Sequence, residues 1–279
     1  MPGYDDEFLG LPAPTPTATV PTVQLDYLHF SVAFRTDRRL AAVTAVNIHG
    51  GLLIEIERTR DVWLLDPRIP AIEQAGPELY LNNDFDRGHL VRRRDPGWGT
   101  RATALTANND TFHYTNAAPQ VAQFNQSKVL WAGLEDYLLE HAATFEQRLA
   151  VFTAPVLDPA DPFYRGVQIP RRFWKIAAWI RQSELAATGY VLDQTDLIAP
   201  ILAADALASD AEPPPLGAYR TFQVPLVDIA DAAGVRMPEL AAAADVLRPA
   251  PAGTTATTEP AGPAGTPWIE LTALDDIRL

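Results

Sequence analysis

The amino-acid sequence predicts an α+β fold, in which a central, mostly antiparallel β-sheet carries helices on its faces. Short apolar runs of strand length, bounded by charged, glycine or proline residues, occur in both halves of the chain. One longer stretch, residues 126–143, instead repeats its apolar side chains at helical spacing. With 279 residues, of which 47% are hydrophobic, the chain can bury the core of one large domain.

The first part of the chain is expected to supply a tail, three strands and a loop. Residues 1–22 are rich in Pro, Thr and Gly, which indicates an extended tail or a strap along the surface. Two nearly continuous apolar runs, residues 27–34 and 40–48, are typical of buried strands. Residues 52–56 are expected to form a third strand, and the proline-containing residues 61–80 a loop.

The folded domain is expected to span residues 23–248. The remainder of its sequence alternates extended and helical patterns. Thr, Phe and Tyr with polar interruptions at residues 103–115 indicate a turn and short extended pieces. The helix at residues 126–143 carries Leu130, Leu134 and Leu138 on one face. Further strands are expected at residues 151–153, 173–180 and 189–192. The apolar run 221–226 precedes an expected helix at residues 227–233, and another helix is expected near residues 238–246.

Residues 249–267 are almost entirely Pro, Ala, Gly and Thr, which is typical of a low-complexity linker. Residues 268–279 follow it and begin with the apolar run Trp268–Leu271. We therefore expect this C-terminal segment to dock back on the domain as a strand.

Composition excludes several classes of site and partner. The chain has no cysteine, so disulfides, thiol nucleophiles and Cys-based zinc sites are excluded, and any metal must bind oxygen or imidazole ligands. A net charge of −13 argues against coating nucleic acid through bulk electrostatics. No apolar run reaches the roughly eighteen residues of a membrane span, so no membrane partner is expected. Residues 1–7 lack the pattern of a secretory signal, so we expect a cytoplasmic protein or one exported by a signal-independent route.

The run Asp-Arg-Gly-His at Asp86–His89 combines residues suited to phosphate chemistry. Imidazole titrates near neutrality, so His89 suits the role of a general base. Arg87 lies two residues away and, on an extended backbone, projects from the same face as His89. The run Arg92–Arg94 that follows has two interpretations, a solvated charged loop or a grip on a phosphate backbone, and the sequence leaves both open.

Asn125 stands at the start of the predicted long helix and also has two interpretations. An asparagine there is a common N-cap, because its side chain accepts a hydrogen bond from the first helical turn. It can equally be a neutral oxygen ligand of Mg²⁺, an ion that keeps most of its waters and takes few protein ligands.

Together with other residues in the same order, these motifs resemble the DNA/RNA non-specific endonucleases of the ββα-metal, or His-Me finger, class. The resemblance spans about residues 25–235. Within that range it includes residues 151–156 and 167–175. Its motifs are Asp86–His89, Asn116 with Pro119 and Gln120, Phe124 with Asn125, and Trp131 with Leu134 and Glu135.

The resemblance implies a ββα-metal fold and a role for each matching residue. His89 is similar to the family's general base, and Arg87 to a clamp on the phosphate or transition state. Asn125 is similar to the direct protein ligand of Mg²⁺, with Mn²⁺ as an alternative ion. Asn116 resembles a residue that orders the site, and Glu135 the glutamate that contacts the water shell of the metal.

Two details depart from the family pattern or leave a choice open. Glu135 follows Asn125 by ten residues, whereas the family spacing is about eight. At about 100° per residue, the two spacings place the glutamate on opposite sides of the asparagine around the helix axis. A π-bulge or a later helix start would restore the register. A further family arginine precedes the motif, and either Arg58 or Arg60 matches it.

The sequence and the resemblance therefore predict a Mg²⁺-dependent, sugar-non-specific endonuclease that hydrolyses DNA and RNA and leaves 5′-phosphates. Two alternatives stay open, a catalytically silent nuclease-like domain that binds or scaffolds, and a phosphodiesterase that acts on small diesters. DNA and RNA substrates are the expected partners. An inhibitor or immunity protein, the oligomeric state and the preference between DNA and RNA are left open by the sequence.

Overall fold

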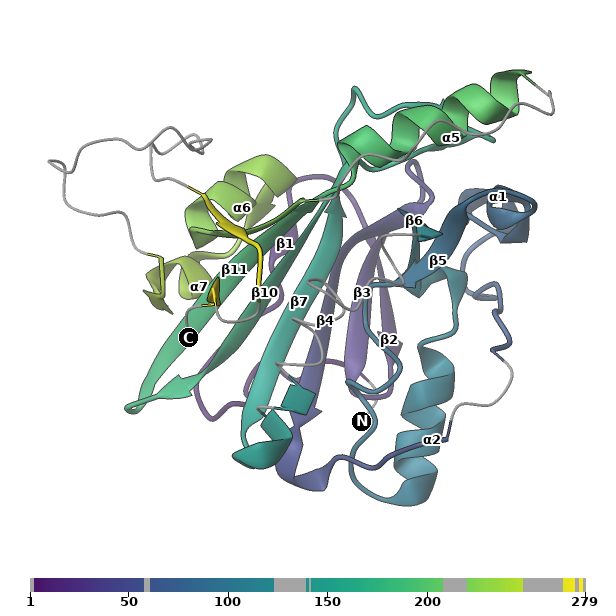
Figure 1. The fold of residues 1–279 in the computed structure, drawn as a ribbon. Helices are drawn as coiled ribbons and strands as arrows, with labels where there is room; N and C mark the ends of the chain where they lie inside the picture. Colours follow the sequence, from purple (N-terminus) through teal and green to yellow (C-terminus); the bar gives the residue numbers. More distant parts are fainter. Residues whose placement is uncertain are drawn as a thin grey trace, which may run out of the picture.

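A large antiparallel sheet forms the centre of the molecule (Figure 1). The structure is a computed structural model, and it describes residues 3–57, 61–122, 139–140, 142–207, 220–247, 268–273 and 276–277. In this part of the chain the sheet has nine strands, in the order β15-β12-β11-β10-β7-β4-β3-β2, and β14 pairs with β11 beside that path. The strands along the path are antiparallel to their neighbours, so the structure has the predicted α+β class.

The elements follow one another along the described chain as follows. The sheet strands are β2 (Val23–Tyr27), β3 (Phe30–Arg35), β4 (Leu40–His49), β7 (Arg148–Val156), β10 (Arg172–Arg181), β11 (Glu184–Asp193), β12 (Arg220–Val224), β14 (Ala244–Asp245) and β15 (Ile269–Leu271). The short two-stranded pairs are β1 (Thr17–Ala18) with β13 (Val235–Arg236), β5 (Phe85–His89) with β6 (Ala117–Val121), and β8 (Phe163–Tyr164) with β9 (Val167–Gln168). The α-helices are α1 (Pro77–Tyr80), α2 (Arg101–Asp110), α5 (Thr195–Leu207), α6 (Leu226–Ala233) and α7 (Pro238–Ala242), and the 3₁₀ turns are Gly50–Leu52, Ala71–Glu73 and Tyr114–Asn116.

The central hairpin, β10 with β11, illustrates how the sequence builds the sheet. Most residues on both faces of the two strands are buried and apolar, as expected for strands covered on both sides. The turn between them consists of Gln182 and Ser183, which have φ values of +52° and +64°. Positive φ at both turn residues matches the right-handed twist of the strands, so the turn sets the register that pairs Arg181 with Glu184.

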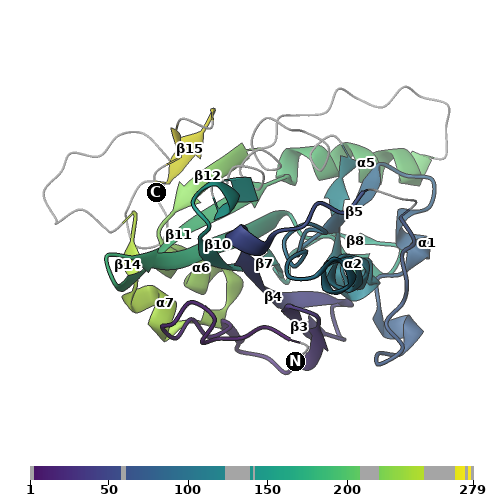
Figure 2. The ribbon, with the colours of Figure 1, turned by 90° about the horizontal axis from the view of Figure 1, so that it is seen from below.

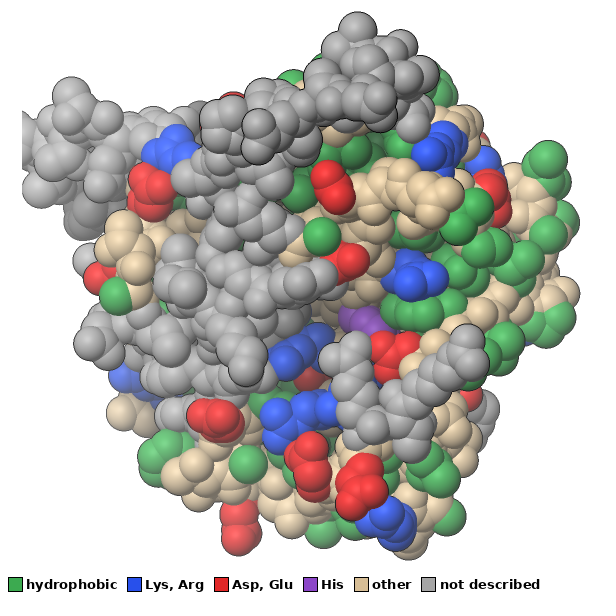
Figure 3. Space-filling model, turned by 45° about the vertical axis from the view of Figure 1, so that its right-hand side comes forward, with side chains coloured by type: hydrophobic (Ala, Val, Ile, Leu, Met, Phe, Trp, Pro, Cys, Tyr) green, Lys and Arg blue, Asp and Glu red, His purple; other side chains and the backbone are tan. Residues whose placement is uncertain are grey.

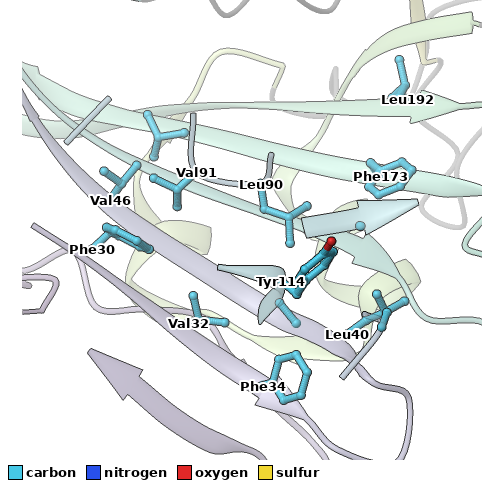
Figure 4. Close-up of a cluster of buried hydrophobic side chains, with 14 of the residues drawn as sticks. Phe30, Val32, Phe34, Leu40, Val46, Leu90, Val91, Tyr114, Phe173 and Leu192 are labelled. Carbon is cyan, nitrogen blue, oxygen red and sulfur yellow. The ribbon is translucent and has the colours of Figure 1, made fainter. Parts of the chain in front are cut away.

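Each face of the sheet is covered by different elements (Figure 2). Side chains of α6 and α7, such as Ile229 and Leu240, pack on one face. The other face carries β5, β6 and α5, whose Leu197 and Ile198 are buried against it. The β5–β6 pair is fixed to this second face by apolar contacts rather than by strand pairing. Figure 4 shows Leu90, Val91 and Tyr114 of this unit beside Phe30, Val32, Phe34, Leu40 and Val46 of β3 and β4.

Both terminal segments lie against the domain. Near the N-terminus, the Tyr4 amide donates to Ser31 Oγ and the Asp5 amide to Asn47 Oδ1, each at 2.8 Å. Near the C-terminus, β15 pairs with β12, and Trp268 Nε1 donates to Asp228 Oδ2 at 2.8 Å. Residues 3–22 therefore form a strap along the surface, and residues 269–271 form the edge strand of the sheet.

Several local predictions were wrong. Residues 52–56 form a 3₁₀ turn and a loop instead of a strand, and pair only through the bridge Leu53–Trp98. Residues 101–110 form helix α2 where extended pieces were expected. The predicted strand at residues 27–34 is broken at His29, whose φ of +69° turns the chain between β2 and β3. Among the described residues, no helix is long and apolar enough to cross a membrane.

A buried polar network ties β2 to the loop that follows β4. The Asp66 carboxylate, 1% exposed, pairs with Arg68 (Nη2–Oδ2 2.6 Å) and accepts a hydrogen bond from the Tyr27 hydroxyl, which lies 2.6 Å from Thr115 Oγ1. Burial works to raise the pKa of Asp66, but the hydrogen bonds from Arg68 and Tyr27 outweigh it and lower that pKa to about 2.

This network predicts an acid-sensitive contribution to stability. A carboxyl group of unfolded chain has a pKa of about 4, so ionised Asp66 stabilises the fold by about 2 kcal/mol above that pH. Because the folded-state pKa is the lower one, this stabilisation is lost as the pH falls from about 4 to about 2. Urea unfolding should show that wild type loses about 2 kcal/mol more across this window than Asp66→Asn does.

The exposed Asp231 of α6 supplies the matched control for this experiment. Asp231→Asn should keep the acid response of the wild type. If Asp66→Asn and Asp231→Asn lose the same free energy of unfolding on acidification, the network does not stabilise the fold as described.

Candidate active site

The candidate site is built on the paired strands β5 and β6. Their pairing brings together two segments that lie apart in the chain. Phe85–His89 runs antiparallel to Ala117–Val121, and His89 is the register partner of Ala117. Helix α2 and the turn Tyr114–Asn116 lie in the chain between the two strands. The unit therefore presents its site residues from a short strand held on the sheet, rather than from a loose loop.

His89 lies at the end of β5 in an aromatic setting. Its ring centroid is 4.6 Å from that of Trp63 and 4.8 Å from that of Phe112, to which it is nearly perpendicular at 87°. Trp63 and Phe112 also contact each other, with centroids 5.4 Å apart. The His89 side chain is half-buried and its Nε2 atom is buried. The aromatic contacts thus restrict the orientation of the ring.

Arg87 is exposed on the same strand, two residues before His89. Its guanidinium carbon lies 5.9 Å from the Trp63 ring centroid and 6.0 Å from that of Tyr80. Such contacts hold a guanidinium in place through the ring quadrupole without neutralising it. Arg87 forms no ion pair with a carboxylate in the part of the chain that the structure describes. Its charge is therefore available to an anionic ligand.

Asn116 is fully buried and connects the two strands behind His89. Its Oδ1 accepts a hydrogen bond from the Val91 amide at 2.9 Å, and its Nδ2 donates to the carbonyl oxygens of Val91 (2.8 Å) and Thr111 (3.0 Å). The Leu90 amide donates to the Asn116 carbonyl at 3.0 Å. Asn116 therefore fixes the backbone that leaves His89, and its side chain does not reach the cleft.

Gly88 leaves room for a neighbouring side chain. Gln120, 2% exposed on β6, lies over the Gly88 backbone, and a Cβ added at Gly88 would come within 2.6 Å of Gln120 Cγ and closer still to its amide group. Overpacking of this kind typically costs about 1–3 kcal/mol. Gly88→Ala should therefore lower the unfolding temperature and, because it displaces β5, weaken any activity that depends on His89.

A double variant supplies the control for this prediction. Gln120→Ala removes the atoms with which the new methyl group collides. Thermal unfolding of Gly88→Ala/Gln120→Ala should therefore recover stability relative to Gly88→Ala alone. An unaltered unfolding temperature for Gly88→Ala would mean that the strand accommodates the methyl group without strain.

A second buried amide anchors β6 to the rest of the sheet. Gln194, fully buried between β11 and α5, accepts a hydrogen bond from the Val121 amide at 3.0 Å. Its Nε2 donates to the carbonyl oxygens of Pro119 (3.2 Å) and Pro170 (2.8 Å). Gln194 therefore satisfies the Pro119 carbonyl and the Val121 amide of β6 with one side chain.

The run Arg92–Arg94 is half-buried rather than a solvated loop. Arg93 Nη1 donates to the Ile56 carbonyl at 3.0 Å, and Arg94 pairs with Glu55 at 3.1 Å. Figure 3 shows Lys and Arg side chains gathered near a histidine at the floor of a hollow on this side of the molecule. A local group of positively charged side chains thus lies around β5 and the residues that follow it, on a chain whose net charge is −13.

The remaining predicted site residues lie outside the described part of the chain. These are Asn125, Glu135, Arg58 and Arg60. In the described ranges, no group of three or more His, Asp or Glu side chains could hold a metal ion. A metal caged by several carboxylates is therefore not found there, whereas a largely hydrated ion held by one amide oxygen would need no such cluster.

The sequence missed three side chains that shape the site. Trp63 and Phe112 form the walls around His89, yet they lie 26 and 23 residues from it in the chain. Gln194 fixes β6 from a loop that carries no recognisable motif. The sequence shows Trp63 only as an apolar residue between acidic and proline residues. That position does not indicate which side chain Trp63 would contact.

Comparison with known proteins gives a consistent result. A sequence model of the DNA/RNA non-specific endonucleases matches residues 12–244. The uncharacterised protein y4fB of Sinorhizobium fredii is 39% identical over 261 aligned residues, which cover 84% of this chain and 38% of that protein. Mitochondrial endonuclease G of Bos taurus and of Homo sapiens is 34% and 33% identical over 94 residues, 34% of this chain and 29% of each relative. The aligned residues thus cover less than half the length of each of these relatives.

Among solved structures, a chain of an EndoG/EndoGI complex, determined to study EndoG inhibition, resembles this one with a TM-score of 0.59 at 18% identity. The likeness covers 79% of this chain and 88% of that chain. At this identity it shows a common fold, and it agrees with the ββα-metal arrangement expected from the motifs.

Proposed function

Because the chain belongs to the DNA/RNA non-specific endonuclease family, we propose that it hydrolyses internal phosphodiester bonds of DNA and RNA with a divalent metal, Mg²⁺ or alternatively Mn²⁺. The observation that carries the proposal is the pairing of His89 with Arg87 on β5. Strand β5 carries the imidazole of His89, which aromatic contacts orient, and, two residues away, the guanidinium of Arg87. Among the described residues, no carboxylate forms an ion pair with Arg87. A proton acceptor and a cation side by side are what attack of water on a phosphodiester requires.

His89 acts in this mechanism as the general base. In this role a ring nitrogen of His89 accepts the proton of the attacking water. Trp63 and Phe112 hold the ring in place through their aromatic contacts. Positioning of this kind matters because proton transfer requires the base within hydrogen-bond reach of the water, about 2.6–3.2 Å.

Arg87 stabilises the charge that develops on the non-bridging phosphate oxygens. Its guanidinium is fixed over Trp63 and Tyr80 before substrate binds, so little reorganisation accompanies the reaction. The proton acceptor and the clamp share Trp63 as a neighbour. Asn116 maintains the backbone after His89 through its hydrogen bonds to Val91.

Asn125 would hold the metal, through its side-chain oxygen, and Glu135 would contact the ion's water shell. The bound ion would neutralise charge on the phosphate and on the departing 3′ oxygen. The donor set fits Mg²⁺ because the side chains of Asn125 and Glu135 offer oxygen atoms, which this ion prefers as ligands. Arg58 or Arg60 would add positive charge beside the scissile phosphate.

Hydrolysis of supercoiled plasmid and of a long RNA, with Mg²⁺ and with EDTA, tests the proposal. Fragments of both polymers with 5′-phosphate ends are expected, and only with the metal. Binding of both polymers without cleavage would favour the alternative of a silent nuclease-like domain. Turnover of a small diester without degradation of either polymer would favour the small-diester phosphodiesterase.

A further inference from the structure

We propose that a cavity beside helix α2, separate from the active site, binds an unpaired nucleobase that carries an amino group. The cavity has a volume of about 540 Å³ and is bordered by the end of β2, by residues 66–68 and by the second half of α2. Figure 1 shows α2 beside the edge of the sheet that carries β2. The choice of a nucleobase rests on the proposed function, which brings nucleic acid and its products to the molecule.

The cavity and the active site lie on opposite sides of residues 112–114. Leu64 pairs with this segment, since its amide donates to the Phe112 carbonyl and its carbonyl accepts from the Tyr114 amide, each at 2.9 Å. His113 has an extended backbone, so its side chain and that of Phe112 point to opposite sides of the chain. Phe112 contacts His89, whereas His113 lines the cavity. The two sites therefore share a wall without sharing a ligand.

Planar side chains form one wall of the cavity. The guanidinium carbon of Arg68 lies 4.6 Å from the Tyr27 ring centroid, and the His113 ring centroid lies 5.1 Å from it. The ion pair with Asp66 fixes Arg68, and a hydrogen bond from Nδ1 to the Asp110 carbonyl (2.9 Å) fixes His113. Unstacked bases rest on aromatic rings and guanidinium planes of this kind. Tyr27 is buried, so a base in the cavity would stack on Arg68 or His113.

Two carboxylates offer acceptor atoms to a ligand in the cavity. Asp110 Oδ2 accepts a hydrogen bond from the Leu28 amide at 3.1 Å, and Asp26 Oδ1 accepts one from Ser31 Oγ at 2.7 Å. In the part of the chain that the structure describes, the second oxygen of each carboxylate accepts no hydrogen bond, and no cation pairs with either group. The open positions of the cavity therefore suit N–H donors.

The charges of the cavity exclude two other kinds of ligand. A phosphate group would meet the carboxylates of Asp26 and Asp110, while Arg68, the one Lys or Arg among the described lining residues, already pairs with Asp66 at 2.6 Å. A divalent cation would need a cluster of His or carboxylate ligands, and the described ranges contain none. The part of the ligand inside the cavity is therefore uncharged, and any phosphate that it carries stays outside.

A base with an exocyclic amino group matches these acceptors. The amino group of cytosine or adenine donates hydrogen bonds to a carboxylate. The oxygen that replaces it in uracil or hypoxanthine would face the same carboxylate with like partial charge. We assign this contact to Asp110, because it lies beside His113, on which the base can stack.

Calorimetric titration with nucleosides tests the proposal without cleavage, since a nucleoside contains no phosphodiester bond. Cytidine should bind at least about fivefold more tightly than uridine, and adenosine than inosine, because an oxygen replaces the amino group in the second member of each pair. Asp110→Asn keeps an oxygen for the Leu28 amide and turns an amide N–H donor toward the ligand, so it should abolish or reverse this ratio. Asp231→Asn, on the exposed side of α6, is the matched control and should leave the ratio unchanged.

A second experiment distinguishes a free nucleoside from a base of a bound strand. It compares kcat/KM for single-stranded oligonucleotides that contain either cytosine or uracil, with wild type and with Asp110→Asn. A cytosine preference that only the wild type shows would assign the cavity to a base of the substrate. Equal kcat/KM values together with unequal nucleoside affinities would assign it to free nucleosides or nucleotides.

The outcomes separate this inference from the proposed function. Equal affinity for cytidine and uridine, no binding of either at millimolar concentration, or a ratio that Asp110→Asn leaves unaltered in folded protein overturns the nucleobase site. Binding of spermidine but of no nucleoside would assign the cavity to organic cations and overturn it as well. Intact nucleoside binding by a chain that cleaves neither oligonucleotide would contradict the proposed function instead.

Discussion

His89→Ala is expected to lower the rate of phosphodiester hydrolysis by about 10²–10⁴-fold, the range typical for loss of a general base. The effect should appear in kcat with little change in KM, because Arg87 and the basic run that follows it remain to bind the phosphates. The fall should persist at every pH at which the fold is intact, since alanine offers no proton acceptor. Initial rates on a fluorescent single-stranded oligonucleotide measure it.

His49→Ala is the matched control for this prediction. His49 is also a half-buried histidine, at the end of β4, and it contacts Trp98 rather than any residue of the candidate site. Its replacement should leave kcat nearly unchanged. If both variants retain the activity of the wild type, His89 is not the base, and if both lose it equally, the loss reflects unfolding rather than chemistry.

Removal of the metal is expected to abolish hydrolysis, and Asn125→Ala is expected to reproduce much of that loss. Mg²⁺ takes few protein ligands, so the loss of one oxygen should raise the Mg²⁺ concentration needed for half-maximal activity by about 10–100-fold. Asn125→Asp keeps an oxygen donor and should retain a measurable metal response. Titration of Mg²⁺ into EDTA-treated protein gives all three values.

The same variant distinguishes the two interpretations of Asn125. If Asn125 only caps a helix, Asn125→Ala should cost about 0.5–2 kcal/mol of stability and leave the metal requirement unchanged. Asn116→Ala provides a contrast, because Asn116 is fully buried with its side chain hydrogen-bonded to Val91 and Thr111. It should lower the unfolding temperature and shift the metal requirement little.

The sheet could be predicted from the sequence because its strands are long and apolar. The runs at residues 40–48 and 173–180 became β4 and β10, since few other structures bury both faces of such a segment. The terminal run Trp268–Leu271 also contributes a strand, the short edge strand β15. The Asp86–His89 motif was recognisable because the chemistry that it suggests lies within four consecutive residues.

Elements that depend on distant partners could not be predicted. Helix α2 consists largely of Thr, Asn and Ala and has little amphipathic pattern. It is stabilised by its N-cap Thr100, which accepts a hydrogen bond from the Thr103 amide, and by Asn108, which donates to the Arg93 carbonyl. The aromatic walls around His89 are likewise a product of the fold, because Trp63 and Phe112 meet only when segments far apart in the chain come together.

Chemical rescue of His89→Gly by imidazole tests the central claim most directly. Removal of the ring leaves a space between Trp63 and Phe112 that has the shape of an imidazole. We expect added imidazole to restore Mg²⁺-dependent cleavage in proportion to its unprotonated form, because only that form accepts a proton. Cleavage by His89→Gly at the rate of the wild type without imidazole, or a folded variant that no concentration of imidazole restores, would contradict the assignment of His89 as the general base.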